Sequence, residues 1–121
     1  GEGELVGRPV SALLSRKNIS YQTLNQKSKN SAEVLQQADI IISGIGREGY
    51  IKGDMIKDGA SIIDAGTSES NGTVVGDADF ESVKDKVDFI SKVPGGVGPV
   101  TVAMMLKNVL QVAQEKNSPH P

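Results

Sequence analysis

The sequence predicts an α/β fold of the doubly wound kind, with a mostly parallel sheet and helices on both faces. Nearly continuous apolar runs rich in β-branched residues alternate with segments of helical periodicity, which is typical of parallel strands joined by helical crossovers. The segments that follow the strands are rich in glycine. With 121 residues, 37% of them hydrophobic, the chain is long enough to bury one core.

The first third of the chain is expected to hold two helices and a short strand. Residues 5–17 are predicted to form the first helix, because apolar residues recur at roughly helical spacing: Leu5, Val10, Leu13 and Leu14. Pro9 fits a first turn, where its missing N–H needs no partner. A short strand is expected at residues 19–24, followed by a helix at residues 31–38 that Asn30 or Ser31 caps.

The middle of the chain carries the clearest strands. Residues 39–43 and residues 60–65 are the apolar runs expected of strands buried on both faces of a sheet. Between them, residues 52–57 are predicted to form a short helix that ends at Gly59. Asn71 and Gly72 indicate a tight turn, with a short returning strand at residues 73–75.

The last third is expected to hold a helix at residues 80–86, a final strand at 87–91 and the longest helix at 100–115, after Pro99. The apolar face of that helix is wider than a single contact requires, because Met104, Met105 and Val112 extend it. It is therefore either deeply buried or in contact with another domain or subunit. We expect one domain over residues 1–116 and a disordered tail at 117–121, which contains the single histidine, His120.

Composition excludes several classes of function. A net charge of -2 and 3% aromatic residues argue against a nucleic-acid partner. The absence of cysteine excludes disulfides, a thiolate nucleophile and cysteine-ligated metals, and we predict no metal site. No apolar run approaches the ~20 residues that span a bilayer, and no signal segment begins the chain, so we predict a cytoplasmic protein with no membrane contact.

Function is expected in the loops beyond the carboxyl ends of the strands, where ligands of such sheets lie. These loops are residues 25–29, 43–47, 64–68 and 94–99, and three of the four contain glycine. Glycine lets the backbone approach a flat or phosphorylated ligand closely, because no Cβ is in the way. A dinucleotide fits that arrangement. Asp64, at the end of a strand, either caps a neighbouring loop or faces the ligand.

The opening stretch GEGELVGRPV resembles a phosphate-binding turn, although its glycines have the spacing GxGxxxG and not GxGxxG. The acidic ribose-binding residue expected about 20 residues later is missing, and position 25 is Asn. Lys27 and Lys29 could attract the 2′-phosphate of NADP, whereas Glu2 would repel a phosphate if it pointed inward. The residues alone leave NAD and NADP open, and a merely flexible N-terminal segment is the alternative interpretation.

The stretch PGGVGPVTV indicates a second functional loop. Its two prolines bracket three glycines and set a particular path, and Gly98, Pro99 and Thr101 are expected to place free N–H groups and a hydroxyl at the start of a long helix. That combination is suited to an anion or a carboxamide.

In this order, the motifs resemble those of the NAD(P)-binding domain of the bifunctional methylenetetrahydrofolate dehydrogenase/methenyltetrahydrofolate cyclohydrolase family (FolD type). The motifs that carry the resemblance are Gly1 with VGRP at 6–9, ADIII at 38–42, Gly46 with GYIKGD at 49–54, DAG at 64–66, NGTVVGD at 71–77 and PGGVGPVTVA at 94–103. They cover almost all of the chain. The resemblance implies a Rossmann-like fold and an enzyme of one-carbon metabolism. That enzyme oxidises 5,10-methylenetetrahydrofolate with NADP and hydrolyses the methenyl product to 10-formyltetrahydrofolate.

The resemblance also implies positions for the ligands. The residues implied to contact the cofactor are Gly1, Gly3, Val6 and Gly7 at the pyrophosphate, Gln26, Lys27 and Ser28 near the adenosine ribose, Gly44, Ile45 and Gly46 along the cofactor, and Gly66, Thr67, Ser68 and Thr101 at the nicotinamide end. The residues implied to border the folate crevice are Gly95, Gly96 and Val97.

Three departures from the family pattern affect the cofactor site. Asn25 stands where the family usually has His, Thr67-Ser68 where it commonly has Ile-Asn, and Glu2-Gly3 where it often has Arg-Ser. The choice of NADP therefore follows the family, and NAD is the alternative that Glu2 favours.

The family also carries an N-terminal catalytic domain with the Tyr and Lys that move protons, and nothing in these 121 residues matches it. The first strand of the nucleotide-binding domain is missing as well. We therefore expect a portion of an enzyme with no catalytic residue of its own, inactive alone, which shares a tetrahydrofolate derivative with that catalytic domain and forms a homodimer. The alternatives are a non-catalytic nucleotide-binding module and an interaction domain derived from the same fold.

Overall fold

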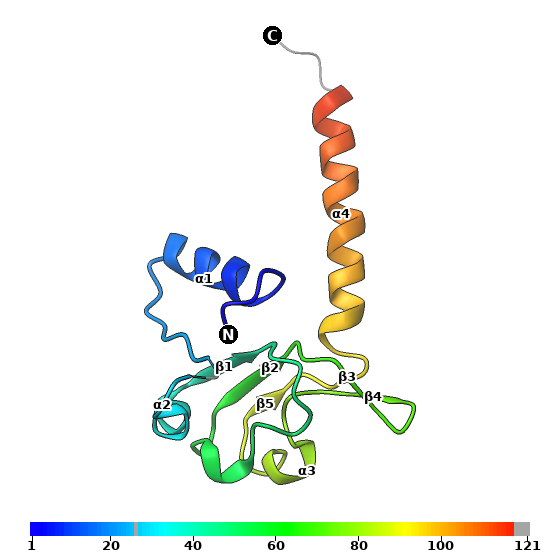
Figure 1. Cartoon of the computed structure of the whole chain (residues 1–121). Helices are drawn as coiled ribbons and strands as arrows, with labels where there is room; N and C mark the ends of the chain where they lie inside the picture. Colours follow the sequence, from blue (N-terminus) through cyan, green and yellow to red (C-terminus); the bar gives the residue numbers. More distant parts are fainter. Residues whose placement is uncertain (26, 118–121) are drawn as a thin grey trace.

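In the computed structural model, which describes residues 1–25 and 27–117, a small parallel sheet lies at the centre of the molecule (Figure 1). Its strands are β1 (Ile40–Ser43), β2 (Ser61–Asp64) and β5 (Phe89–Ile90), in the order β1-β2-β5. Ile41 of β1 is level with Ile62 of β2, and Ser61 of β2 is level with Phe89 of β5. All three strands run parallel, so their carboxyl ends meet at one edge, as the sequence predicts.

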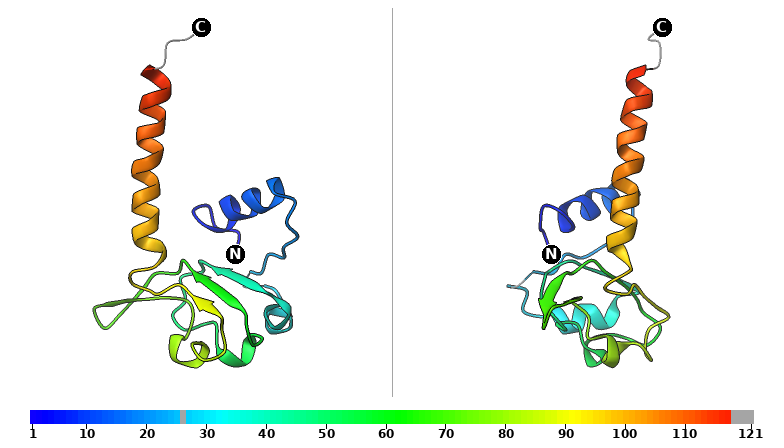
Figure 2. Two further views of the ribbon diagram at one scale, coloured as in Figure 1. Left: turned by 180° about the vertical axis from the view of Figure 1, so that it is seen from behind. Right: turned by 90° about the vertical axis from the view of Figure 1, so that its right-hand side faces the viewer.

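Helices lie on both sides of this sheet (Figures 1 and 2). On one side are α2 (Ser31–Gln37), the short 3-10 helix η1 (Gly53–Met55) and α3 (Phe80–Val83), and on the other is α1 (Gly7–Arg16). The longest helix, α4 (Val97–Asn117), projects away from the sheet. The doubly wound α/β fold class is thus confirmed.

The core lies between the sheet and the layer formed by α2, η1 and α3. Its buried members are Leu35, Ile41, Ile51, Ile56, Ile62 and Val83. Ile62 and Val83 are fully buried, and deleting a side chain of that size from a packed interior costs about 2–5 kcal/mol. This packing fixes the position of the strands and hence of the loops at their carboxyl ends.

An antiparallel hairpin extends from the sheet after β2. It pairs β3 (Ser68–Ser70) with β4 (Thr73–Val75), and Ser70 lies opposite Thr73. Asn71 and Gly72 form the predicted turn with φ values of 50° and 76°. Positive φ at both central residues is the type I′ geometry that matches the twist of a hairpin. The sequence predicts β4 but not β3, whose residues are all polar.

Three expectations about the elements are wrong. Residues 19–24 form no strand, because no strand pairs with them, and the backbone of Ile19 instead donates to Leu14 O at 3.0 Å. The last helix begins at Val97, before Pro99, since proline within a first turn removes no helical hydrogen bond. Asn117, expected in the tail, ends α4, whereas residues 118–121 with His120 lie outside the described residues.

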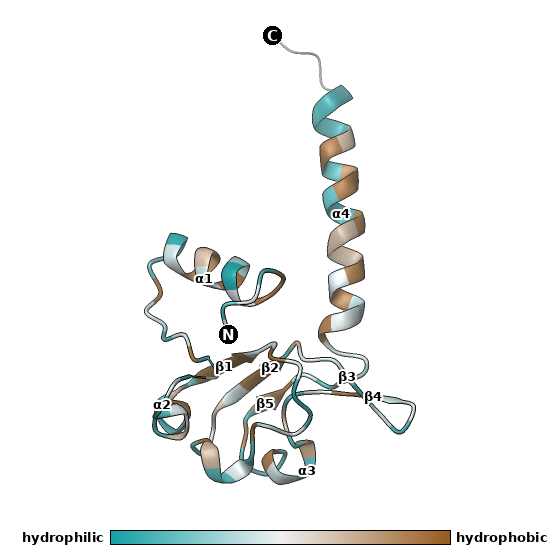
Figure 3. Cartoon of the chain, in the orientation of Figure 1, coloured by the Kyte–Doolittle hydropathy of each residue, from teal (hydrophilic) through white to brown (hydrophobic). Residues whose placement is uncertain are grey.

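The last helix is not buried within this chain. In the described part of the protein α4 has no buried residue, and large apolar side chains such as Met105, Leu106 and Val109 are more than 60% exposed. Figure 3 shows apolar residues along most of its length. Deep burial within this chain is therefore wrong, and contact with another domain or subunit stays a prediction. No helix within residues 1–25 and 27–117 has the length and apolarity needed to cross a membrane.

Candidate functional site

A cleft of about 850 Å³ opens between α1 and β1, and its lining includes the whole of β1 and the loop that follows it. Its walls come from α1, the extended residues 19–25, α2, β1 and the loop that follows β1. The volume is in the range of about 300–1,000 Å³ typical of sites for small molecules and cofactors. One end of the cleft, at the carboxyl end of β1, therefore lies where a sheet of this kind binds its ligand.

The N-terminal turn and the loop after β1 meet at one end of this cleft. A Cβ on Gly44 would lie 2.9 Å from Cγ1 of Val6, and a Cβ on Gly1 would lie 3.5 Å from Cγ2 of Ile45. Within the turn, a Cβ on Gly7 would lie 1.8 Å from the carbonyl oxygen of Gly1. Any side chain at position 7 would therefore clash with the backbone, and only glycine fits there. Five predicted site residues thus come together and line the cleft: Gly1, Val6, Gly7, Gly44 and Ile45.

The buried carboxylate of Asp77 accepts hydrogen bonds from the end of β1 and from the loop after it. Its Oδ2 accepts hydrogen bonds from Oγ of Ser43 at 2.6 Å and from N of Ile45 at 2.8 Å, and its Oδ1 accepts one from N of Arg47 at 2.9 Å. Asp77 is fully buried. The sequence prediction missed this residue, although the motif NGTVVGD contains it. Three donors compensate its charge, since buried carboxylates need such partners.

The carboxylate of Asp64 accepts hydrogen bonds in the same way from the loop after β2 and from the segment after β4. Its Oδ1 accepts from N of Gly66 at 2.9 Å and N of Asp77 at 3.1 Å, and its Oδ2 accepts from N of Ala78 at 2.8 Å. Of the two interpretations of Asp64, loop capping is the one that these bonds support. The two carboxylates link the ends of β1 and β2 to the segment that follows β4.

The positions of these two carboxylates also explain why residues 66 and 76 are glycines. A Cβ on Gly66 would lie 2.2 Å from the carboxylate of Asp77, and a Cβ on Gly76 would lie 2.2 Å from Oδ2 of Asp64. Gly66, predicted to approach the cofactor, is therefore required by contacts within the chain itself. Its neighbours Thr67 and Ser68 lead into the hairpin, where Ser68 begins β3.

Hydrogen bonds between side chains and the backbone link Asn25 to Lys27 and Ser28. Oδ1 of Asn25 accepts a hydrogen bond from N of Lys27 at 2.9 Å, and Oγ of Ser28 accepts one from N of Asn25 at 3.0 Å. Asn25 lines the cleft, whereas Lys27 and Ser28 do not. The predicted ribose contact Gln26 lies outside the described residues.

Four more predicted residues lie away from the cleft, at the base of α4: Gly95, Gly96, Val97 and Thr101. Oγ1 of Thr101 donates to the carbonyl oxygen of Val97 at 2.9 Å, so this hydroxyl is one turn inside the helix and not at its start, contrary to the expectation. A Cβ on Gly96 would lie 2.2 Å from the carbonyl oxygen of Lys92. Gly95 has a φ of 95°, which favours glycine. By contrast, Gly3 and Gly46 have nothing within 4 Å of the Cβ position and face open space.

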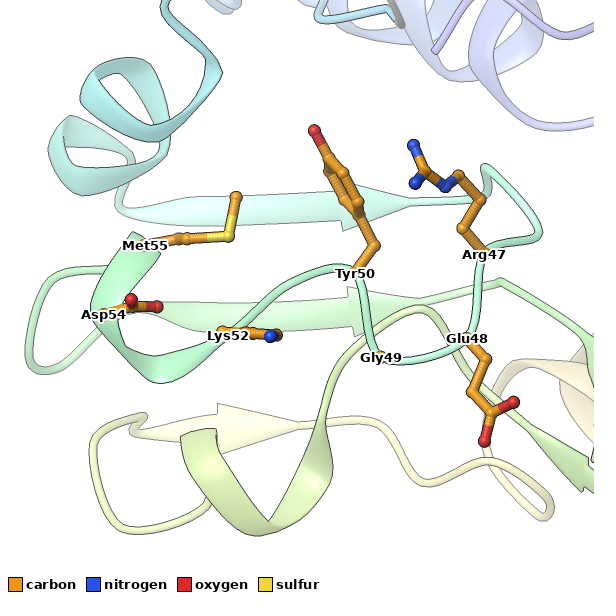
Figure 4. Close-up of a pocket in the computed structure, with 7 residues that line it drawn as sticks. All are labelled: Arg47, Glu48, Gly49, Tyr50, Lys52, Asp54 and Met55. Carbon is orange, nitrogen blue, oxygen red and sulfur yellow. The ribbon is translucent and has the colours of Figure 1, made fainter.

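A smaller hollow of about 420 Å³ adjoins the loop after β1 (Figure 4). It is lined by Arg47, Glu48, Gly49, Tyr50, Lys52, Asp54 and Met55. The guanidinium of Arg47 lies over the ring of Tyr50, 4.8 Å from the centroid. Arg47 and Tyr50 line both the hollow and the large cleft. Neither residue is among the predicted site residues, because only the fold brings them to the cleft.

One ion pair lies at the amino end of β1. Nζ of Lys57 donates to Oδ1 of Asp39, and this bond lowers the pKa of Asp39 below its ordinary value of 3.8. Asp39 lines the cleft. Because Lys57 pairs with it, the negative charge of Asp39 is compensated there.

Comparison with known proteins identifies related chains. A family model described as "Tetrahydrofolate dehydrogenase/cyclohydrolase, NAD(P)-binding domain" matches residues 1–117. The bifunctional protein FolD of Caldanaerobacter subterraneus is 45% identical over 111 residues, which are 92% of this chain and 40% of the relative. The mitochondrial C-1-tetrahydrofolate synthase of Saccharomyces cerevisiae is 43% identical over 123 residues, 96% of this chain and 13% of the relative.

Solved structures are similar over nearly the whole chain. The bifunctional enzyme FolD of Campylobacter jejuni has a TM-score of 0.92 and 37% identity, covering 96% of this chain and 42% of that one. The Trypanosoma brucei methylenetetrahydrofolate dehydrogenase-cyclohydrolase, solved with NADP cofactor and inhibitor, has a TM-score of 0.90 and 34% identity, covering 98% and 43%. The chain spans about two fifths of the length of the bacterial relatives it matches.

Proposed function

Since this chain belongs to the tetrahydrofolate dehydrogenase/cyclohydrolase family, whose NAD(P)-binding domain it matches over residues 1–117, we propose that it binds the cofactor of such an enzyme. The whole enzyme oxidises 5,10-methylenetetrahydrofolate with NADP and hydrolyses the methenyl product to 10-formyltetrahydrofolate. The observation that carries this proposal is the cleft at which the Gly1–Gly7 turn meets the loop after β1.

The backbone beside the cleft fits a dinucleotide. A pyrophosphate needs backbone close to it, and Gly3 and Gly46, which follow the lining residues Gly1 and Ile45 in the sequence without lining the cleft themselves, have open space where a side chain would stand. Gly46 also has a φ of 69°, so its amide faces a direction that other residues rarely allow. The N–H of Arg8 closes the turn on the carbonyl oxygen of Gly3 at 2.9 Å, which gives the turn a fixed shape.

The residues of this chain bind and orient, and they move no proton. The bound cofactor supplies the hydride acceptor. We assign the nicotinamide end to Gly66, Thr67, Ser68 and Thr101, and the border of the folate site to Gly95, Gly96 and Val97. The acid-base groups that act on folate belong, in this proposal, to the part of the relatives' length that this chain does not cover.

NADP is the proposed cofactor. The support is the Trypanosoma brucei relative, which was solved with NADP. Glu2 departs from the family's usual arginine at that position and places a negative charge in the turn, so discrimination against NAD is expected to be weak.

The exposed α4 supports the proposed partners of the domain. Its apolar residues are suited to burial against the folate-binding domain or a second copy, and we propose a homodimer. A cytoplasmic location agrees with the absence of cysteine, although the yeast relative is named as mitochondrial.

Calorimetric titration with NADP and NAD tests the proposal. We expect saturable binding of NADP, which Gly44→Ala weakens because its Cβ would push Val6 and the N-terminal turn out of place. Arg16→Ala, at the end of α1, is the control, since Arg16 does not line the cleft. If the chain binds neither nucleotide at millimolar concentration, the proposed function is wrong.

A further inference from the structure

We infer that Arg47 binds the pyrophosphate of the dinucleotide, an inference that rests on the proposed function. Arg47 is the only lysine or arginine among the described residues that line the large cleft. The remaining lining residues are apolar or neutral, apart from Asp39, which Lys57 compensates. A cofactor pyrophosphate carries negative charge, and among the described residues that line this cleft Arg47 has the only positively charged side chain to meet it.

The charge of Arg47 is not used inside the protein. Four ion pairs occur within residues 1–25 and 27–117, and they use Arg8, Lys57, Lys84 and Lys86. The guanidinium of Arg47 lies over the face of Tyr50, 4.8 Å from the ring centroid, and it makes no ion pair within those residues. Such a contact orients the group and leaves its N–H donors free for an anion. Figure 4 shows Arg47 and Tyr50 pointing to the same side, toward α1, while Glu48 points the other way.

The backbone of Arg47 is held in place before any ligand binds. Its N–H donates to Oδ1 of the buried Asp77 at 2.9 Å, and its carbonyl oxygen accepts from N of Tyr50 at 3.3 Å. The backbone therefore loses little freedom on binding, which favours affinity. This support distinguishes Arg47 from an ordinary surface arginine such as Arg16, at the end of α1.

The position of the loop after β1 indicates which phosphate of the dinucleotide Arg47 binds. A Cβ on Gly44 would lie 2.9 Å from Cγ1 of Val6, so the loop that carries Arg47 lies against the turn proposed for the pyrophosphate. Lys27 and Ser28 of the proposed ribose loop do not line the cleft that Arg47 lines. The pyrophosphate is therefore a better match for Arg47 than the 2′-phosphate of NADP.

The test measures dissociation constants of NADP and NAD for Arg47→Ala, Arg47→Lys and the control Arg16→Ala, at low and high salt. We expect Arg47→Ala to weaken both nucleotides by about tenfold or more, the range for a charge-assisted contact. Its affinity should also depend less on salt than that of the wild type. Arg47→Lys should recover part of the loss, because it keeps the charge without the planar fork. Arg16→Ala should bind like the wild type.

Each outcome decides the inference. Loss of NADP affinity alone would assign Arg47 to the 2′-phosphate and overturn the pyrophosphate contact. Unchanged affinity in Arg47→Ala, with binding intact in the wild type, would overturn the inference and leave the proposed function standing. A wild-type chain that binds neither nucleotide would overturn the proposed function and the inference together. Urea unfolding of each variant shows that a loss of binding is not a loss of fold.

Discussion

Oγ of Ser43 donates a hydrogen bond of 2.6 Å to Oδ2 of Asp77, which lies 34 residues further along the chain. Both residues are buried, and the same carboxylate also holds the backbone of Ile45 and Arg47. The end of β1 and the segment after β4 are thereby joined through one side chain. The shape of the loop that borders the cleft depends on Asp77, although Asp77 does not line the cleft itself.

Asp77→Asn should destabilise the protein and loosen this loop. An asparagine amide replaces one acceptor oxygen by an NH₂ group, so at least one of the three donors loses its partner. An unsatisfied buried donor costs roughly 1–3 kcal/mol, and we expect the free energy of unfolding to fall by about 2 kcal/mol in urea. Hydrogen exchange should show faster exchange at the amides of Ile45 and Arg47.

The control for this change is Asp85→Asn, which alters an exposed carboxylate. It should leave both readouts unchanged. Equal stability of Asp77→Asn and wild type would show that the three bonds contribute little to the fold.

Sequence patterns predicted the helices, strands and turns that depend mainly on residues close together in the sequence. The apolar runs of β1 and β2, the helical spacing in α1 and α2 and the Asn71-Gly72 turn all appear as expected. A strand at residues 19–24 was wrong because a strand needs a partner, which no local pattern reports. The polar β3 was missed for the opposite reason, since it forms only by pairing with β4.

The site was predicted in the same uneven way. Gly1, Gly7 and Gly44 belong to sequence motifs that predict a site, and the structure shows that all three line the cleft. Asp77 and Arg47 were not found as site residues, because their roles arise from contacts between segments far apart in the sequence. Gly66 was assigned to the cofactor, but its Cβ position is filled by Asp77. A glycine in a loop thus indicates that another group lies close to its backbone, but the sequence does not say whether that group is a ligand or a side chain of the same protein.

Gly66→Ala is predicted to be much more harmful than Gly98→Ala. The new Cβ at position 66 would lie 2.2 Å from the Asp77 carboxylate, whereas the one at position 98 meets nothing within 4 Å. Overpacking of this kind costs roughly 1–3 kcal/mol, while alanine in a helix is favoured over glycine by about 1 kcal/mol. Urea unfolding should show a loss for Gly66→Ala and no loss for Gly98→Ala. A fully stable Gly66→Ala protein would contradict the packing of this loop.

The Asp39 and Lys57 ion pair predicts a pH dependence at the acid end. Because Lys57 lowers the pKa of Asp39 in the folded protein, the pair stabilises the fold above the ordinary value of 3.8. That contribution disappears as the pH falls through the lowered folded pKa. Titration of the Asp39 carboxyl by NMR should show a midpoint below 3.8 in the wild type and a higher one in Lys57→Met. Equal midpoints would mean that the exposed pair does not form in solution.

The exposed α4 predicts self-association through its apolar side chains. Leu106 and Val109 are each 68% exposed, and an apolar helix surface of this extent favours burial against another chain. Replacing both by lysine should shift a dimer toward monomer in sedimentation velocity runs over a concentration series. Helix content should remain, since leucine and lysine have similar helix propensity and lysine exceeds valine. Lys107→Gln, on the same helix, is the control and should sediment like the wild type. A wild-type chain that stays monomeric at every concentration would leave α4 free for contact with the folate-binding domain and would contradict the homodimer.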